Sequence, residues 1–347
     1  MTAAAVDVFN VNDTASLQLA AEKCSKLAIG SSAVVNLAPG TYLVRQPILF
    51  QGPGSLSIQS DNSLSPAQIQ CAPDITGSAL QVSANSSLVL HGISFLGCSS
   101  TAMQVDMVAD GPSTVEISSC SFINCTGQSA GALGISVSLS VTSAAASNVT
   151  LTGCTFESSN VVPPTDPTSG ISDSTGHAAV ITAGPGVSLG VTVSGNSSFL
   201  NNGDLTEAGG SGTTVLYVGC GGTSLDPQVV DAPSCSLSLS DSVWASNSAI
   251  TSSGALLSCS GAPNCTMDVE RCTFDYNRHS FMDFDLGIKV EEVFKVRAST
   301  HFIYGSICLP LFSRTGIEIH PSYALGPSHI SYHYDLFVSI HTCREWS

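Results

Sequence analysis

Two carboxylates of this 347-residue chain share one position in a repeated sequence pattern, and paired carboxylates are the first requirement of sugar-cleaving chemistry. Acid–base cleavage of a glycosidic bond needs two carboxyl groups about 5–9.5 Å apart. Glu116 and Asp268 occupy the same outward position of the pattern, but four copies separate them. At the spacing of neighbouring strands this separation is about 19 Å. The sequence therefore does not predict that they act as a pair.

Two further groups of polar residues contain side chains that can titrate or bind metal. Asp173 and His177 lie in one short segment, which we interpret as a plain loop. His329, His333 and His341 lie near the C-terminus, but no carboxylate or defined scaffold beside them completes a zinc site. No Cys-x-x-Cys pair or mixed Cys/His spacing indicates zinc either. The sequence thus predicts no catalytic residue, no metal site and no cofactor.

A calcium-dependent polyuronate lyase needs clustered carboxylates together with a basic residue that removes a proton. Beyond two lysines in a predicted N-terminal helix, the repeated region contains only Arg45 and Arg271 as basic residues. Arg271 falls at a predicted corner, one copy after Asp241. We therefore expect an exposed ion pair between Arg271 and Asp241 across neighbouring copies.

The chain has 13 cysteines and six Asn-x-Ser/Thr sequons, which together indicate an oxidising, glycosylating compartment. Cys120 and Cys154 share one inward position in consecutive copies, so they are predicted neighbours within disulfide range. The same position also suits a small apolar side chain. Cys98 and Cys125 each lie three residues after the aromatic of their copy, and they are also expected to stack. The candidate glycosylation sites are Asn12, Asn85, Asn124, Asn148, Asn196 and Asn264.

One short pattern that occurs six times positions all of these residues. Each copy alternates apolar and polar residues, breaks for two residues, resumes in the opposite phase and ends on an aromatic. The six aromatics are Phe95, Phe122, Phe156, Phe199, Trp244 and Phe274. The pattern recurs every 27 to 46 residues, and the Gly-, Ser- and Pro-rich stretches between copies account for this difference in length. This recurrence is typical of a stacked architecture.

Each copy reads as a strand, a corner and a second strand, and a further apolar block after the copy supplies a third strand. Stacking such units in register gives an all-β parallel β-helix, predicted over residues 30–277 with the six aromatics stacked inside. An amphipathic helix is predicted over residues 14–28, with Thr14 as its N-cap and Gly30 as its stop. This helix would cover the open end of the stack, within an N-terminal cap of about residues 7–60.

The N-terminal region and the repeats resemble known families. Residues 13–18, together with Leu37-Ala38-Pro39-Gly40-Thr41-Tyr42, resemble the entry of pectate-lyase-like, right-handed β-helix proteins. Phe122-Ile123-Asn124-Cys125 and the following Gly131-Ala132-Leu133-Gly134-Ile135 are similar to the repeats of polymorphic outer membrane proteins, although Gly-Gly-Ala-Ile never appears intact. The resemblance implies a right-handed coil. The hydrolase motifs of the superfamily (Asn-Thr-Asp, Asp-Asp, Gly-His-Gly and Arg-Ile-Lys) are absent.

Charge and composition divide the chain at residue 277. Residues 1–277 carry 19 acidic and 4 basic side chains, whereas residues 278–347 carry 7 and 6 and contain six of the eight histidines. An acidic body repels nucleic acid, and no apolar run is long enough to span a membrane. We therefore expect a β-helix domain over residues 1–277. Residues 278–347 form an atypical tail, which is a cap, the start of a second domain or sequence that does not fold.

Two functions fit these features. The first is a non-catalytic extracellular or cell-surface β-helix that contacts polysaccharide, a cell-wall polymer or other surface proteins. The second is a polysaccharide lyase or glycoside hydrolase of the pectate-lyase-like superfamily, active or decayed. The first residues show no signal-peptide pattern, so extracellular placement implies a truncated start or a fragment of a longer protein. A smooth face of Ser, Thr and Asn favours the first function, and a cleft with several carboxylates favours the second.

Overall fold

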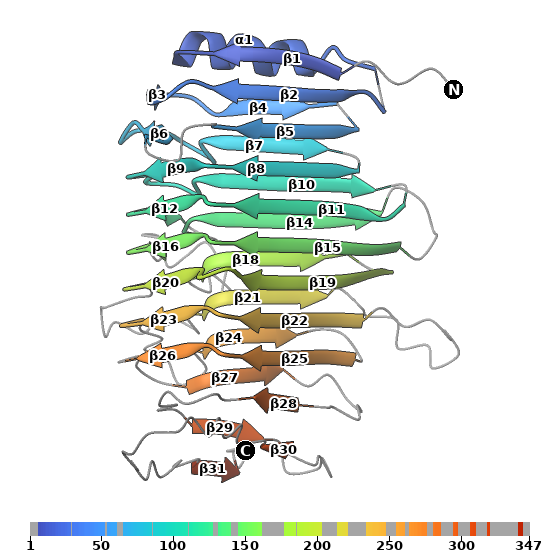
Figure 1. The fold of residues 1–347 in the computed structure, drawn as a ribbon, viewed down its shortest axis with the longest axis vertical. Helices are drawn as coiled ribbons and strands as arrows, with labels where there is room; N and C mark the ends of the chain where they lie inside the picture. The colour runs from blue at the N-terminus through green and yellow to red at the C-terminus, as the bar shows by residue number, and fades with distance from the viewer. Residues whose placement is uncertain are drawn as a thin grey trace, which may run out of the picture.

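The computed structural model describes residues 6–28, 30–52, 54–60, 65–84, 86–109, 111–127, 131–139, 145–161, 177–184, 186–202, 214–220, 234–247, 255–260, 264–275, 280–285, 294–297, 306–309, 318–319 and 339–342. These residues form a parallel β solenoid. Three sheets run along the stack, and each coil adds one strand to each sheet as far as residue 275 (Figure 1). All strand pairs in these sheets are parallel, as the recurrence of the pattern predicts.

The strands of each sheet follow one another in sequence order along the stack. Sheet A contains β1 (Val6–Val11), β2 (Ser32–Leu37), β5 (Ser55–Gln59), β8 (Ser87–His91), β11 (Ser113–Ser118), β15 (Ala145–Thr152), β19 (Val187–Ser194), β22 (Ser234–Ser240), β25 (Asn264–Glu270), β28 (Phe294–Arg297) and β30 (Glu318–Ile319). Sheet B contains β3 (Gly40–Val44), β6 (Ala67–Cys71), β9 (Ile93–Leu96), β12 (Ser121–Ile123), β16 (Thr155–Glu157), β20 (Ser198–Leu200), β23 (Val243–Ala245) and β26 (Thr273–Asp275). Sheet C contains β4 (Ile48–Gln51), β7 (Leu80–Ala84), β10 (Met103–Ala109), β14 (Leu133–Leu139), β18 (His177–Ala183), β21 (Thr214–Cys220), β24 (Ala255–Ser260), β27 (Ser280–Asp285), β29 (Ser306–Leu309) and β31 (Ser339–Thr342). A short pair, β13 (Thr126–Gly127) and β17 (Asn160–Val161), lies beside them.

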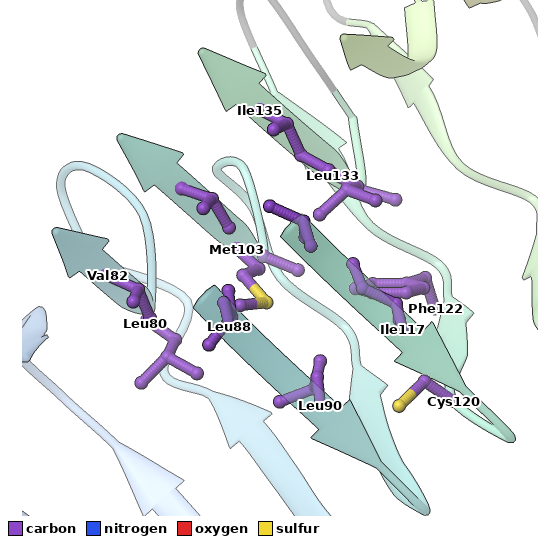
Figure 2. Packing of buried hydrophobic residues seen from close by; sticks show 14 of the residues in the cluster. Leu80, Val82, Leu88, Leu90, Met103, Ile117, Cys120, Phe122, Leu133 and Ile135 are labelled. Carbon is purple, nitrogen blue, oxygen red and sulfur yellow. The ribbon is translucent and has the colours of Figure 1, made fainter. Parts of the chain in front are cut away.

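Columns of like side chains fill the core between the sheets. Figure 2 shows residues of sheets A, B and C, among them Leu88, Met103 and Phe122, gathered in this interior. The rings of Phe95, Phe122, Phe156, Phe199 and Trp244 stack in one column, with neighbouring centroids 3.9 to 5.0 Å apart. All five are fully buried, which confirms the predicted aromatic column. Phe274 continues the register opposite Trp244, and its side chain lies outside the described part.

A single left-handed residue makes the corner between sheets A and B. The second residue of each predicted break has positive φ: Gly92, Ser119, Gly153, Asp241 and Arg271 lie between 49° and 66°. One residue in this conformation turns the chain and shifts the alternation by one position, which explains the phase change in the sequence. The copy that begins at Val191 and ends at Phe199 is one residue longer than the others. It has two left-handed residues, Gly195 and Asn196, so the extra residue lies in the corner.

A second left-handed corner follows sheet B, and a buried polar column lies just beyond it. Gly97, Asn124, Ser158, Asn201 and Ser246 have positive φ there. The next residues point inward and stack as Cys98, Cys125, Ser159, Asn202 and Asn247, all at most 1% exposed. The asparagines that follow the aromatics therefore have two roles. Asn124 and Asn201 occupy the left-handed position. Asn202 and Asn247 form hydrogen bonds inside the coil.

The helix α1 (Thr14–Cys24) packs against β4, β1 and β3 at the N-terminal end of the stack (Figure 1). Its buried face contains Leu17, Ala20, Ala21 and Cys24. The N-cap is Asp13 rather than the predicted Thr14, because the Asp13 carboxylate accepts a hydrogen bond from the Ser16 backbone N–H at 2.7 Å.

The helix also ends earlier than predicted, at Cys24 instead of Ala28. The next N–H groups bond carbonyls only three residues back, Lys26 to Lys23 and Leu27 to Cys24, which tightens the chain out of the α-helix. Leu27, which the helical spacing places on the same apolar face as Leu17 and Cys24, packs against the core but is only partly buried.

The described segments beyond residue 275 add strands only to sheets A and C. β27 pairs with β24, β28 with β25, and shorter strands follow on both sheets. The last strand of sheet B, β26, ends just before the predicted boundary at residue 277. The division of the chain into a coil and a separate tail stays a prediction.

Candidate functional site: the outer face of sheet A

The outer face of sheet A carries three columns of small polar side chains. We define this outer face by the outward positions of β5, β8, β11, β15, β19 and β22. They are Ser55, Ser87, Thr114, Asn148, Gly190 and Ser236; Ser57, Val89, Glu116, Thr150, Thr192 and Ser238; and Gln59, His91, Ser118, Thr152, Ser194 and Ser240. Most are Ser, Thr, Asn or Gln. The register places equivalent groups about 4.8 Å apart along the stack.

Hydrogen bonds between neighbouring coils order the N-terminal end of the third column and its continuation onto β2 and β1. The Asn36 Nδ2 donates to Asn10 Oδ1 at 3.1 Å, and the Gln59 Nε2 donates to Asn36 Oδ1 at 2.9 Å. His91 Nδ1 lies 2.9 Å from Ser118 Oγ. These bonds fix side chains that would otherwise rotate freely, so the polar groups point outward in a defined orientation.

The carboxylates of the outer face and its extension lie far apart. The register runs from Glu116 through Thr150, Thr192 and Ser238 to Asp268, which is four strand steps. Four steps correspond to about 19 Å, as the sequence predicts. A pair for glycosidic cleavage needs about 5–9.5 Å, so Glu116 and Asp268 do not form one.

The predicted ion pair across neighbouring coils is present. Arg271 donates to both carboxylate oxygens of Asp241, from Nε at 2.6 Å and Nη2 at 2.8 Å, and it also pairs with Glu270. The hydrogen bonds from Arg271 lower the pKa of Asp241 and, in return, raise the pKa of Arg271. Both side chains are more than 40% exposed, so solvent screens the pair. A guanidinium held in this way does not act as a proton-abstracting base.

Cys120 and Cys154 are buried neighbours, as predicted, but they remain free thiols. The register of β12 and β16 places them opposite each other, and the Thr155 N–H bonds the Cys120 carbonyl at 2.9 Å. Burial raises the pKa of both thiols, to about 11 for Cys154. The disulfide that the spacing allows is not formed. The two residues act as small apolar side chains, and each thiol donates to a backbone carbonyl.

The disulfides in the described residues are Cys71–Cys98 and Cys220–Cys235. The first links successive coils, with Cα atoms 4.8 Å apart. Cys71 lies before the first recognisable copy, so the repeat alone did not align it with Cys98. The signal that could have found it is the separation of 27 residues, which equals the shortest spacing between copies.

Four of the six candidate glycosylation sites have described side chains, and all four are exposed: Asn12, Asn124, Asn148 and Asn196. Asn124 and Asn196 adopt left-handed backbone at corners, with φ of 53° and 62°. Asn85 and the side chain of Asn264 lie outside the described part. Exposure at corners and strand ends suits addition of a glycan, which stays a prediction.

The remaining candidate residues fall mostly outside the described part. Asp173, the His177 side chain, His329 and His333 lie there, as does the side chain of His341 on β31. Among the described residues, no group of three or more His, Cys, Asp and Glu side chains is arranged to hold a metal ion. No helix in the described part is long and apolar enough to cross a membrane.

Comparison with known proteins does not assign the chain to a family. No protein-family model and no curated protein matches the chain. One similar solved structure is ORF18 of Geobacillus virus E2, at 11% sequence identity and a TM-score of 0.33. The alignment covers 83% of this chain and 61% of that one, so the chain spans less than two thirds of its length. This likeness is too weak to inform the function.

Proposed function

We propose that the protein is a non-catalytic, extracellular or cell-surface β-helix that binds an extended, uncharged polysaccharide along the outer face of sheet A. The observation that carries this proposal is the set of three aligned polar columns on that face. In the same proposal the coil is right-handed and pectate-lyase-like, and α1 caps its first turn. Other surface proteins are the alternative partners.

The geometry of the columns favours a long, repetitive ligand over a compact one. Hydroxyl and amide groups recur at each coil, so an extended polymer can repeat the same contacts along the stack. A single such hydrogen bond contributes only about 0.5–1.5 kcal/mol, because water already satisfies both partners. Useful affinity therefore comes from many contacts along one chain, as in other multivalent binding.

The charges favour an uncharged polymer. Glu116 on the outer face and Asp268 just beyond it carry negative charge, and Arg271 beside the face is already paired with Asp241. A polyuronate would meet these carboxylates without a compensating cation from the outer face. Neutral glycans carry no charge, so they meet no such repulsion.

The extracellular part of the proposal rests on the disulfides and the sequons. Disulfides persist in oxidising compartments and are rare in the reducing cytosol. Cys71–Cys98 and Cys220–Cys235 fit this placement, and four exposed sequons are available to a glycosylating enzyme.

A glycan array probed with the purified protein tests the binding function. The double variant Thr192→Val/Ser238→Ala removes two neighbouring hydroxyls and leaves every candidate sequon intact. Two lost hydrogen bonds of about 0.5–1.5 kcal/mol each should weaken neutral-glycan binding about 5- to 140-fold. Thr155→Val, which removes a hydroxyl from the outer side of sheet B, is the matched control and should bind normally. Equal binding by the double variant would refute the assigned face.

Incubation with polygalacturonate, alginate and neutral glycans, with and without calcium, tests the catalytic alternative. We expect no sustained release of reducing ends or unsaturated products. Sustained release that disappears when a carboxylate is replaced would establish the lyase or hydrolase function instead.

A further inference from the structure

Three cysteines of consecutive coils form one column beside the corner that follows sheet B. Cys71 and Cys98 are joined by a disulfide, and their Cα atoms are 4.8 Å apart. This distance is the spacing of neighbouring strands, so the bridge runs along the stack. Cys125 lies in the next coil, on the opposite side of Cys98, where the Thr126 N–H donates to the Cys98 carbonyl at 2.6 Å. Cys125 is a free thiol and is 0% exposed.

The sulfur of Cys125 lies between its own coil and the coil that holds Cys98. Its Sγ is 3.6 Å from the carbonyl oxygen of Ile123 in its own coil and 4.0 Å from that of Phe95 in the coil of Cys98. The later members of the column also contact the aromatic carbonyl of the preceding coil, at 3.4 Å for Ser159 Oγ and 2.9 Å for Asn202 Nδ2. The direction of Cys125 is therefore set by its position in the coil.

We propose that Cys98 is a shared disulfide partner, and that the bridge moves between Cys71–Cys98 and Cys98–Cys125 within the folded coil. The Cys125 thiolate attacks Sγ of Cys98 from the side opposite the existing bond. A new sulfur–sulfur bond forms, and Cys71 leaves as a thiolate. The proton lost from Cys125 is taken up by Cys71 through solvent. No electrons are gained or lost overall, so the exchange needs no external oxidant.

The two isomers are balanced in chain entropy. The bridge between Cys71 and Cys98 spans 27 residues, and Cys98 and Cys125 have the same separation. Loop-closure entropy depends on this number, so it favours neither bridge. The isomers differ in the thiol that is left unbonded. The Cys71–Cys98 bridge leaves Cys125, which is fully buried, and the Cys98–Cys125 bridge leaves Cys71, which is 5% exposed. Exchange therefore transfers a thiol from the interior to a position nearer the surface.

The pH dependence of the exchange follows from burial of the attacking thiol. Burial raises the pKa of Cys125 to about 11, and a backbone hydrogen bond involving Cys98 opposes this only in part. Only the thiolate attacks, so the exchange is slow near neutral pH. Its rate should rise about tenfold per pH unit until the pH approaches that pKa.

The test maps disulfides in the native protein without added oxidant or reductant. Samples held at pH 7, 8 and 9 are quenched by acid denaturation, their free thiols are alkylated with N-ethylmaleimide at weakly acidic pH, and the peptides are analysed by mass spectrometry after digestion. The Cys98–Cys125 peptide and alkylated Cys71 should increase together, about tenfold faster per pH unit. Cys125→Ser should abolish both signals, and it should fold because Ser159 occupies the same position one coil later. Cys154→Ser removes a similarly buried thiol outside the column and should leave the exchange unchanged.

A second variant tests the new bridge directly. Folded Cys71→Ser, treated with oxidised glutathione, should form Cys98–Cys125 and release two equivalents of reduced glutathione. Persistence of Cys98 and Cys125 as free thiols would overturn the proposal. So would a Cys98–Cys125 bridge in the wild type that appears only with the mixed pairings produced in denaturant, because that result assigns the exchange to unfolding.

Discussion

Replacing Asn202 by Ala should destabilise the middle of the coil more than the loss of one small side chain suggests. Asn202 is 1% exposed and links three coils. Its Oδ1 accepts from the Ser159 N–H at 2.9 Å, and its Nδ2 donates to the Phe156 carbonyl at 2.9 Å. The same Nδ2 also lies 3.1 Å from Asn247 Oδ1, which accepts the Asn202 backbone N–H at 3.0 Å as well.

The expected magnitude follows from the partners that the substitution leaves behind. Asn202→Ala leaves the buried N–H of Ser159 without a partner, which costs about 1–3 kcal/mol, and it removes a second donor from the Phe156 carbonyl, which costs about 0.5–1.5 kcal/mol. The total is about 1.5–4.5 kcal/mol. Asn247 Oδ1 keeps the backbone N–H of residue 202, so it adds little. Asn202→Ser should lose less, because a hydroxyl in this position reaches the preceding carbonyl, as Ser159 Oγ does at 3.4 Å.

Guanidinium unfolding followed by circular dichroism measures the loss, and hydrogen exchange locates it. A solenoid couples each coil mainly to its neighbours, so we expect faster exchange in β16 and β20 with smaller effects near α1. Asn201→Gly is the control, because Asn201 is exposed with φ of 54° and glycine adopts this conformation readily. A loss below about 1 kcal/mol for Asn202→Ala, or exchange unchanged in β16, would refute the argument.

Three further tests concern the aromatic column, the corner between sheets A and B, and the Cys220–Cys235 disulfide. Phe156→Ala should cost about 3–5 kcal/mol and Phe156→Leu much less, because leucine refills most of the space; equal losses by thermal unfolding would contradict the stacked column. Gly92→Ala should lower the melting temperature more than Gly153→Ala, because the added Cβ would lie 2.7 Å from the Ser60 carbonyl oxygen of the preceding coil at Gly92, but 3.2 Å from the Gly195 carbonyl oxygen of the following coil at Gly153; the reverse order would contradict this packing. Replacing both Cys220 and Cys235 by Ser should cost about 3 kcal/mol in denaturant midpoint measurements, as expected for a bridge that closes 15 residues, and no loss would show that the bridge is strained or not formed.

The repeat predicted the features that depend on side-chain alternation. The register aligns Leu88, Val115 and Val149 across neighbouring strands, as the copies align them in sequence. The alternation of apolar and polar residues shows which side chains face inward. A shift of one residue in strand register would bury the polar side chains and expose the apolar ones. The facing pair Asp241 and Arg271 follows from the same register, and so does the neighbouring position of Cys120 and Cys154.

Features that depend on local hydrogen bonding were predicted less well. The N-cap of α1 is Asp13 and not Thr14, although both residue types favour that position. Ser16 decides between them, because its backbone N–H bonds the Asp13 carboxylate and its Oγ accepts from the Asp13 N–H at 3.1 Å. Disulfide choice is equally local. Cys120 and Cys154 are neighbours with thiols turned to backbone carbonyls, whereas Cys71 and Cys98 are bonded.

The composition of the outer face of sheet A is the main support for the proposed binding role. Inward positions must be small or apolar to fill the coil, which explains why Ile93, Cys120 and Cys154 replace one another. Outward positions carry no such constraint, and a strand tolerates charged residues there, as Glu116 and Asp268 show. Yet the columns between these two carboxylates contain almost only hydroxyl and amide groups. Solubility alone is served better by acidic side chains. The proposed ligand, which makes hydrogen bonds without charge repeatedly along the stack, would account for this composition.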